Sequence, residues 1–117
     1  MSKERILSEE QVEQLRRDGF LLVRGMYSPD EVADIGRWTD EVANYPEVPG
    51  KYMMYFEKSQ VDGSRILCRI ENFVPYHEGF STLITTRRMQ QAVSELFGDE
   101  AVLFKDKINF KLPGGDG

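Results

Sequence analysis

The sequence predicts an α+β fold, with three amphipathic helices and several short strands in 117 residues. Two segments begin with a serine capping box and continue with apolar residues at helical spacing. Two later segments flank Asp62-Gly63-Ser64 and have the pattern of a β-hairpin. Residues 101–111 alternate between apolar and polar side chains, as a strand does. The length is that of one domain, or of part of one.

The first helix is predicted to start after Ser8, because Gln11 stands three residues later and completes a capping box. A short apolar stripe follows, and Gly19 is placed to end the helix. Residues 20–23, Phe-Leu-Leu-Val, are predicted to form a short buried strand.

The second helix is predicted to start after Ser28, where Pro29 occupies the first helical position and Glu31 completes another capping box. Apolar residues at helical spacing continue to about Ala43. Residues 44–51 contain two prolines and a glycine, which predicts a loop.

The predicted hairpin consists of strands at residues 52–56 and 65–73. Residues 75–79 are predicted to be irregular. A third helix is expected after Thr85 or Thr86, with Gly98 at its end.

The end of the sequence is a glycine-rich loop at residues 112–117, directly after the strand predicted at residues 101–111. Such a loop normally leads into another element. We therefore expect either a single domain or the N-terminal part of a longer one, with a lead-in of helices and strands at residues 1–100 followed by a first core strand.

The chain carries a net charge of −5, and its first 50 residues hold 6 Lys or Arg against 11 Asp or Glu. A duplex-binding module normally shows a basic stripe, so nucleic acid is an unfavourable partner. An apolar run long enough to span a bilayer is missing, and the polar N-terminus does not resemble a signal peptide. The single cysteine cannot form an intramolecular disulfide, which is typical of a reducing compartment. Together, these observations predict a cytoplasmic protein that binds neither nucleic acid nor membranes.

Few self-contained active-site motifs are present. The sequence has neither a phosphate-binding loop of the GxxxxGK[ST] type nor a GxGxxG motif. His77 is the only histidine, so a two-histidine metal site cannot be assembled, and we interpret His77 as a loop histidine without a catalytic role. Cys68 is interpreted as a packing residue of its strand.

The last predicted strand has two different faces. One face carries Lys105, Lys107, Asn109 and Lys111 together with Leu103. The other carries Asp106 with the apolar residues Val102, Phe104, Ile108 and Phe110. The polar row either faces solvent or lines a barrel interior that binds a dicarboxylate. Asp106 is either an edge feature or a buried partner for a basic group.

A second polar group lies in the returning strand of the hairpin. Arg69, Glu71 and Asn72 form either an ion-pair lattice or one wall of a ligand pocket.

Three segments resemble the phytanoyl-CoA dioxygenase family. Residues 7–25, which contain LSEEQV and RDGFLLVRG, are similar to the opening of that family, and residues 28–32 (SPDEV) are similar to its second helix start. Residues 107–115 (KINFKLPGG) resemble the strand and loop that lead into its iron-binding His-x-Asp motif. Their order and separation strengthen the resemblance.

The resemblance implies a non-haem iron(II), 2-oxoglutarate-dependent dioxygenase on a double-stranded β-helix, or jelly-roll, fold. It places the iron ligands beyond residue 117, so that this chain supplies no metal ligand or catalytic residue of its own. It further implies that Lys107, Asn109 and Arg69, with Glu71 beside them, face the cosubstrate and substrate. Family members that act on small amino-phosphonates resemble this chain more than those that act on acyl-CoA.

Two functions follow as hypotheses. The first is the N-terminal part of an iron(II)/2-oxoglutarate dioxygenase that hydroxylates a small substrate, and that is inactive as the isolated chain. The alternative is a non-catalytic acidic α+β binding or scaffold module. A His-x-Asp motif encoded beyond Gly117 would favour the first hypothesis.

Overall fold

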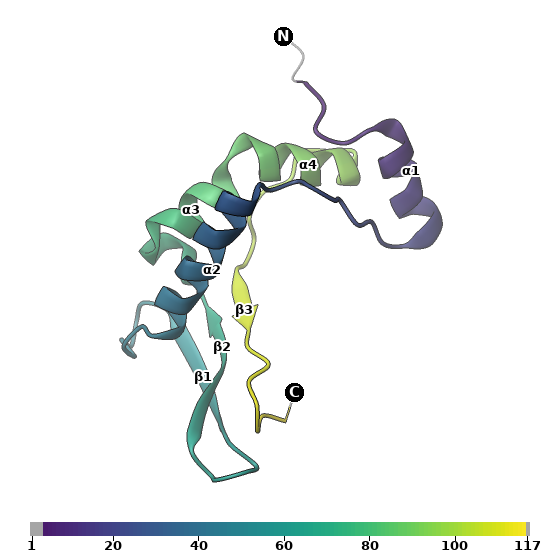
Figure 1. Cartoon of the computed structure of the whole chain (residues 1–117). Coiled ribbons are helices and arrows are strands. Elements are labelled where there is room, and N and C mark those ends of the chain that lie inside the picture. The colour runs from purple at the N-terminus through teal and green to yellow at the C-terminus, as the bar shows by residue number, and fades with distance from the viewer. Residues whose placement is uncertain (1–3, 117) are drawn as a thin grey trace.

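Four α-helices and a three-stranded sheet make up residues 4–116, which a computed structural model describes (Figure 1). In chain order the elements are α1 (Glu9–Asp18), α2 (Pro29–Ala43), β1 (Met53–Lys58), β2 (Arg65–Glu71), a 3₁₀ turn η1 (Val74–Tyr76), α3 (Glu78–Thr85), α4 (Arg87–Phe97) and β3 (Lys107–Asn109). The predicted α+β composition is confirmed. Within the described residues, no helix is long and apolar enough to cross a membrane.

The molecule is elongated, with extents of 53 × 29 × 27 Å. Its radius of gyration is 17.1 Å, whereas a compact domain of about 100 residues has a radius of gyration of about 13 Å. Figure 1 shows why: α1 stands beside the far end of α4, and the β1–β2 hairpin extends away from the helices. Apolar side chains consequently stay exposed at several places along the chain.

The first two helices begin where the capping boxes predict. The Ser8 hydroxyl accepts a hydrogen bond from Gln11 N, and the Gln11 side chain accepts one from Ser8 N. Ser28 and Glu31 repeat this exchange at the start of α2. Gly19 ends α1 in the left-handed conformation, with φ 81°. Since glycine adopts positive φ without a Cβ penalty, its predicted role as the end of the helix is confirmed.

Replacing either capping serine by alanine is expected to lower the free energy of unfolding by about 1 kcal/mol, because a helix amide loses its acceptor. Urea denaturation followed by circular dichroism measures the change for Ser8→Ala and Ser28→Ala. Ser8→Asp and Ser28→Asp retain an acceptor and serve as controls. Unchanged stability in both alanine variants would show that the helices are not held by these caps.

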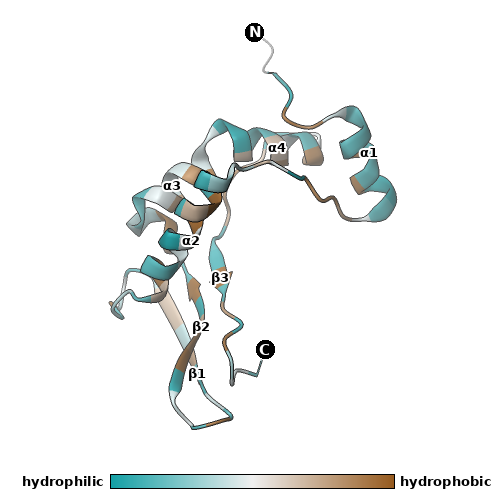
Figure 2. Cartoon of the chain, viewed as in Figure 1, coloured by the Kyte–Doolittle hydropathy of each residue, from teal (hydrophilic) through white to brown (hydrophobic). Residues whose placement is uncertain are grey.

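The buried strand predicted at residues 20–23 does not form. The segment is extended, with Leu21 and Val23 half-buried against a small cluster around Leu7, Val12 and Ala92. Its other two side chains point outward; Phe20, for example, is 65% exposed. The apolar stretch is visible after α1 in Figure 2. A strand requires a pairing partner, and among residues 4–116 none lies beside this segment.

The sheet is antiparallel, with strand order β1-β2-β3. The hairpin is confirmed, although its strands are shifted: β1 runs to Lys58 rather than ending at residue 56, and β2 ends at Glu71 rather than at residue 73. Asn72 ends β2 because its backbone turns to the left-handed region, at φ 61°, while its side-chain amide donates to Lys51 O.

The helix α3 starts in the region predicted to be irregular. His77 is its N-cap, and the His77 Nδ1 atom accepts a hydrogen bond from Phe80 N at 3.1 Å. The following helix, α4, lies where the third helix was predicted, with Thr86 at its N-cap and Gly98 at its C-cap. The Thr86 hydroxyl does not cap α4 and instead donates to Leu83 O.

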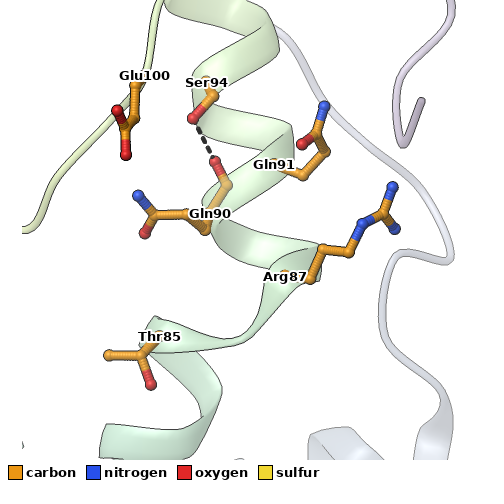
Figure 3. Close-up of a pocket in the computed structure, with 6 residues that line it drawn as sticks. All are labelled: Thr85, Arg87, Gln90, Gln91, Ser94 and Glu100. Atoms are coloured by element: carbon orange, nitrogen blue, oxygen red, sulfur yellow. Dashed lines mark hydrogen bonds between the residues drawn. The ribbon is translucent and has the colours of Figure 1, made fainter. Parts of the chain in front are cut away.

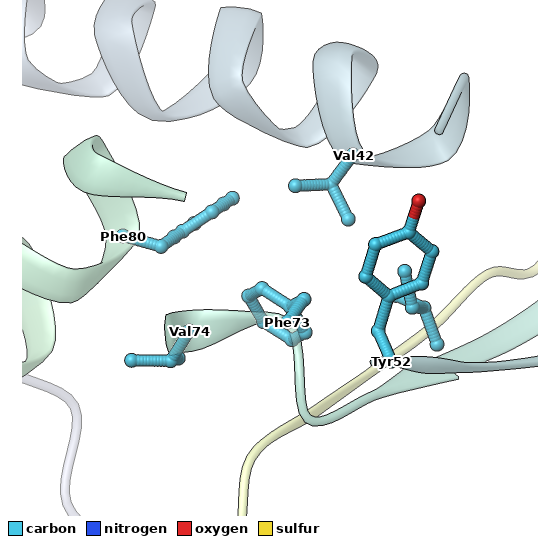
Figure 4. Packing of buried hydrophobic residues seen from close by; sticks show 6 residues of the cluster. Val42, Tyr52, Phe73, Val74 and Phe80 are labelled. Atoms are coloured by element: carbon cyan, nitrogen blue, oxygen red, sulfur yellow. The ribbon is translucent and has the colours of Figure 1, made fainter. Parts of the chain in front are cut away.

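The main core lies between the sheet and the helices α2 and α3. Its buried side chains are Val42, Tyr52, Ile70, Phe73, Val74 and Phe80 (Figure 4). Helix α3 packs closely on α2, because Gly79 leaves room for the Trp38 ring. The core therefore covers one face of the sheet and leaves the other face open.

A second contact ties the N-terminal segment to α4. The Glu95 carboxylate accepts hydrogen bonds from Ile6 N at 2.9 Å and Leu7 N at 2.8 Å. Burial alone would raise the pKa of Glu95, but these hydrogen bonds and one from Gln91 outweigh burial and lower the pKa.

The strand predicted at residues 101–111 is shorter than expected, since only Lys107–Asn109 pair with β2 as a strand. The predicted alternation of the two faces is confirmed near that pairing, because Asp106, Ile108 and Phe110 are half-buried while the intervening residues are exposed. Earlier in the segment the apolar row lacks cover, and Phe104 is 95% exposed.

Candidate functional site

The open face of the sheet carries a group of polar side chains from all three strands. Pairing places Tyr55, Arg69 and Asn109 opposite one another in one row across the sheet. Glu71 and Lys107 are partners in the next row. Ile70 and Ile108 alternate with them and pack toward the main core, so the polar residues lie on the face turned away from the helices.

The four predicted site residues are thus brought together. Lys107 and Asn109 are exposed, and the Arg69 side chain is 37% exposed. Glu71 differs from its neighbours, because its side chain is only 7% exposed. We call these four residues, together with Lys105, the polar face.

Glu71 pairs with two cations. Its Oε2 atom lies 2.8 Å from Arg69 Nε, and its Oε1 atom lies 3.2 Å from Lys105 Nζ. The Arg69 guanidinium is also 4.3 Å from the centre of the Tyr55 ring, a cation–π distance. Of the two interpretations of Arg69 and Glu71, the ion-pair lattice is therefore present, extended by Lys105.

A hollow of about 410 Å³ adjoins Glu71 at the end of the polar face. Met53 and Glu71 line it from the sheet, and residues 103–106 line its other side. The pocket-wall interpretation of Glu71 is thus compatible with the ion-pair lattice. The Asp106 carboxylate accepts a hydrogen bond from Phe73 N at 2.9 Å, so its partner is a backbone amide rather than the basic group considered above.

A larger hollow, of about 670 Å³, lies elsewhere, along α4 (Figure 3). Its lining comes from α4 and the segments that flank it: Thr85, Arg87, Gln90, Gln91, Ser94 and Glu100. The hydrogen bond drawn there joins the Ser94 hydroxyl to Gln90 O within the helix. None of the predicted site residues lines this hollow, and we do not assign it a function.

His77 is a structural residue in a buried position rather than a loop histidine. Its Nδ1 atom accepts from Phe80 N, and its Nε2 atom lies 3.1 Å from a Glu41 carboxylate oxygen. Both ring nitrogens are therefore engaged, with Nε2 as the donor because Nδ1 accepts. Cys68, interpreted as a packing residue, is half-buried in β2.

A metal centre is not assembled by residues 4–116, in which no three His, Cys, Asp or Glu side chains come close enough to hold an ion. We expect the chain of 117 residues to bind iron(II) no more tightly than an ordinary acidic surface. Anaerobic calorimetry measures this binding, with magnesium as a control for general attraction to carboxylates. A stoichiometric iron site of micromolar or tighter affinity would contradict the prediction.

Comparison with known proteins assigns most of the chain to one family. The phytanoyl-CoA dioxygenase (PhyH) family matches residues 15–117. The 2-aminoethylphosphonate dioxygenase of an uncultured bacterium, HF130_AEPn_1, is 46% identical over 110 residues, which are 94% of this chain and 42% of that protein. No solved structure matches significantly.

Two further relatives have names that also refer to phosphorus compounds. The methylphosphonate hydroxylase of Gimesia maris is 30% identical over 111 residues, 95% of this chain and 42% of the relative. A probable alpha-ketoglutarate-dependent hypophosphite dioxygenase of Stutzerimonas stutzeri is 26% identical over 112 residues, 94% and 39% of the two chains. The chain thus spans about two fifths of the length of these relatives.

Proposed function

The chain belongs to the phytanoyl-CoA dioxygenase family, and we propose that it is the N-terminal part of an iron(II)- and 2-oxoglutarate-dependent dioxygenase acting on a small phosphonate. The observation that carries this proposal is the 46% identity to a 2-aminoethylphosphonate dioxygenase over nearly the whole chain. The alpha-ketoglutarate dependence in the name of the hypophosphite relative supports the choice of cosubstrate. We further propose a cytoplasmic enzyme in which the observed sheet forms part of a jelly roll.

The polar face is the part of this chain that suits such ligands. 2-Oxoglutarate carries two carboxylates and a phosphonate carries anionic oxygens, so both require cationic and hydrogen-bonding partners. Lys107 offers a charge, Arg69 a charged fork of donors, and Asn109 an amide that donates and accepts. All three are accessible on one face of the sheet. We propose that they contact the cosubstrate or the substrate, with Glu71 beside them.

The iron does not fit the residues that the structure describes, because these residues provide no group of three ligands. We propose that the ligands lie in the remaining three fifths of the enzyme, which this chain does not span. The contribution of the present residues is then to bind and orient the anionic ligands, and no step at the metal is assigned to them.

A chimera tests the proposal. This chain replaces the matching segment of the 2-aminoethylphosphonate dioxygenase from HF130_AEPn_1, and the purified chimera receives iron(II), 2-oxoglutarate and 2-aminoethylphosphonate or methylphosphonate. We expect phosphonate-dependent formation of succinate and an oxidised phosphonate. The intact relative is the positive control. A folded chimera that turns over neither phosphonate would contradict the proposal and favour the non-catalytic binding module.

A further inference from the structure

Glu71 is unusual because it is a buried carboxylate on a face that is otherwise open. Its side chain is 7% exposed, whereas the side chains of Arg69 and Lys105 are 37% and 58% exposed. Burial of a carboxylate is costly unless opposite charges and hydrogen bonds compensate for the lost water. The two cations supply the opposite charge, and their ion pairs with Glu71 restrain all three side chains.

The contact with Arg69 leaves the arginine able to bind another group. Glu71 Oε2 lies 2.8 Å from Nε, on one edge of the guanidinium, as an ion-pair contact without a hydrogen bond from Nε. The Tyr55 ring supports the guanidinium from a second direction. Neither restraint involves the two terminal nitrogens, and within residues 4–116 these nitrogens donate no hydrogen bond, so they can bind an oxyanion on the open face.

The charges around Glu71 also favour an anion. Lys105 lines the hollow, and Arg69 and Lys107 lie beside Glu71 on the sheet, so three positive charges surround this carboxylate. Asp106 also lines the hollow and adds a second formal negative charge, although its Oδ1 atom accepts a hydrogen bond from the Phe73 amide. Three cations against two carboxylates leave an excess of one positive charge. Each Glu71 oxygen already contacts one cation of this chain.

We propose that Glu71 is a positioning residue, which holds Arg69 and Lys105 in place to bind an oxyanion, either a phosphonate or a carboxylate group. The inference rests on the proposed function and adds Lys105 to the polar side chains that recognise the ligand. It assigns Glu71 an indirect role, in which the carboxylate orients cations and does not touch the ligand.

The test measures the sign of a change in KM. In the chimera described above, Glu71→Gln removes both the negative charge and the ion pairs that hold Arg69 and Lys105 in place. Removal of the charge alone would strengthen anion binding and lower KM, whereas loss of orientation raises it. We expect the KM of one anionic ligand to rise about fivefold while kcat changes less than about twofold, because a loosened Arg69 fork loses its fixed geometry.

The matched control is Glu47→Gln. Glu47 also pairs with an arginine of β2, Arg65 at 2.8 Å, but at the opposite end of the strand. This control should leave both KM values unchanged. Separate titrations of the phosphonate and of 2-oxoglutarate show which of the two anions Arg69 and Lys105 bind.

Arg69→Lys gives a second test that does not depend on the folding of the Glu71 variant. It keeps the charge but loses Nε and the planar fork, and it should raise the same KM. If Glu71 acts through Arg69, the double variant should be no worse than the more impaired single variant. Unchanged or lower KM values for both single variants in an active chimera would overturn this inference alone. An inactive, folded wild-type chimera would instead overturn the proposed function.

Discussion

Replacing Gly79 by alanine is expected to lower the free energy of unfolding by about 2 kcal/mol, because the added methyl group overpacks a close helix contact. A Cβ atom at Gly79 would clash with Trp38 Cε2 and would lie 2.6 Å from Trp38 Cδ2. The indole cannot move away freely, since its ring packs edge-on against Phe80, with 5.9 Å between the ring centres. Strain at this position would therefore reach the main core.

The control is Gly36→Ala in α2. A Cβ atom at Gly36 would meet nothing within 4 Å, and its φ is not positive. Alanine is favoured over glycine inside a helix, so this variant should be more stable by about 0.5–1 kcal/mol. Urea denaturation of the two variants gives opposite shifts if the Gly79–Trp38 contact forms as described. A Gly79→Ala variant as stable as the parent chain would show that α3 does not pack this closely on α2.

Elements defined by local signals could be predicted from the sequence. The capping boxes at Ser8 and Ser28 use residues three positions apart, and both helices begin there. Gly19 and Gly98 end their helices in the left-handed conformation. Each of these interactions closes within one turn of helix, so no distant part of the chain is needed to determine it.

The missed helix α3 lacked such a signal. Its cap is His77, which is outside the usual set of serine, threonine, aspartate and asparagine. Gly79 in its first turn is also typical of a loop in the sequence, whereas in the structure it allows the close approach of the Trp38 ring. The preference for a helix here comes from packing on α2, which is a non-local interaction.

Two predicted strands are absent or shorter in the structure because strand formation, like the packing of α3, depends on non-local interactions. Residues 20–23 and 101–106 have apolar or alternating side chains, but strand formation also requires a neighbouring strand. Only residues 107–109 find one, in β2. A pattern within a segment determines which side chains share a face and does not show whether a partner exists.

In the candidate site, too, the local pattern could be predicted and the long-range contacts could not. Alternation correctly grouped Lys107 with Asn109, and the observed register places them opposite Glu71 and Arg69. The contact between Lys105 and Glu71 was not predicted, because it depends on the path of the irregular segment before β3. Long-range ion pairs of this kind leave no spacing signal in a sequence.

Asn109→Leu should weaken the binding of 2-oxoglutarate or of the phosphonate at least about tenfold in the chimera, or about 1.4 kcal/mol. Asn109 is exposed and stands opposite Arg69 in the pairing of β2 with β3. Its amide is therefore available to a ligand that Arg69 also binds, and leucine would leave that ligand with an unpaired oxygen. Because Asn109 makes no contribution to the main core, the free energy of unfolding should change little.

Lys111→Leu is the control on the same side of the chain. Lys111 follows β3 toward the glycine loop and has no partner in the β2 pairing, so its loss should affect binding less. KM and kcat for both ligands, together with urea denaturation of each chimera, separate a binding defect from a folding defect. Unchanged kinetics for Asn109→Leu would assign the row of Lys107, Asn109 and Lys111 to solvent. A tenfold loss of binding in Asn109→Leu but not in Lys111→Leu would instead place the open face of this sheet against the ligand. Alternate residues of a strand share a face, so Lys107 would then face the ligand as well.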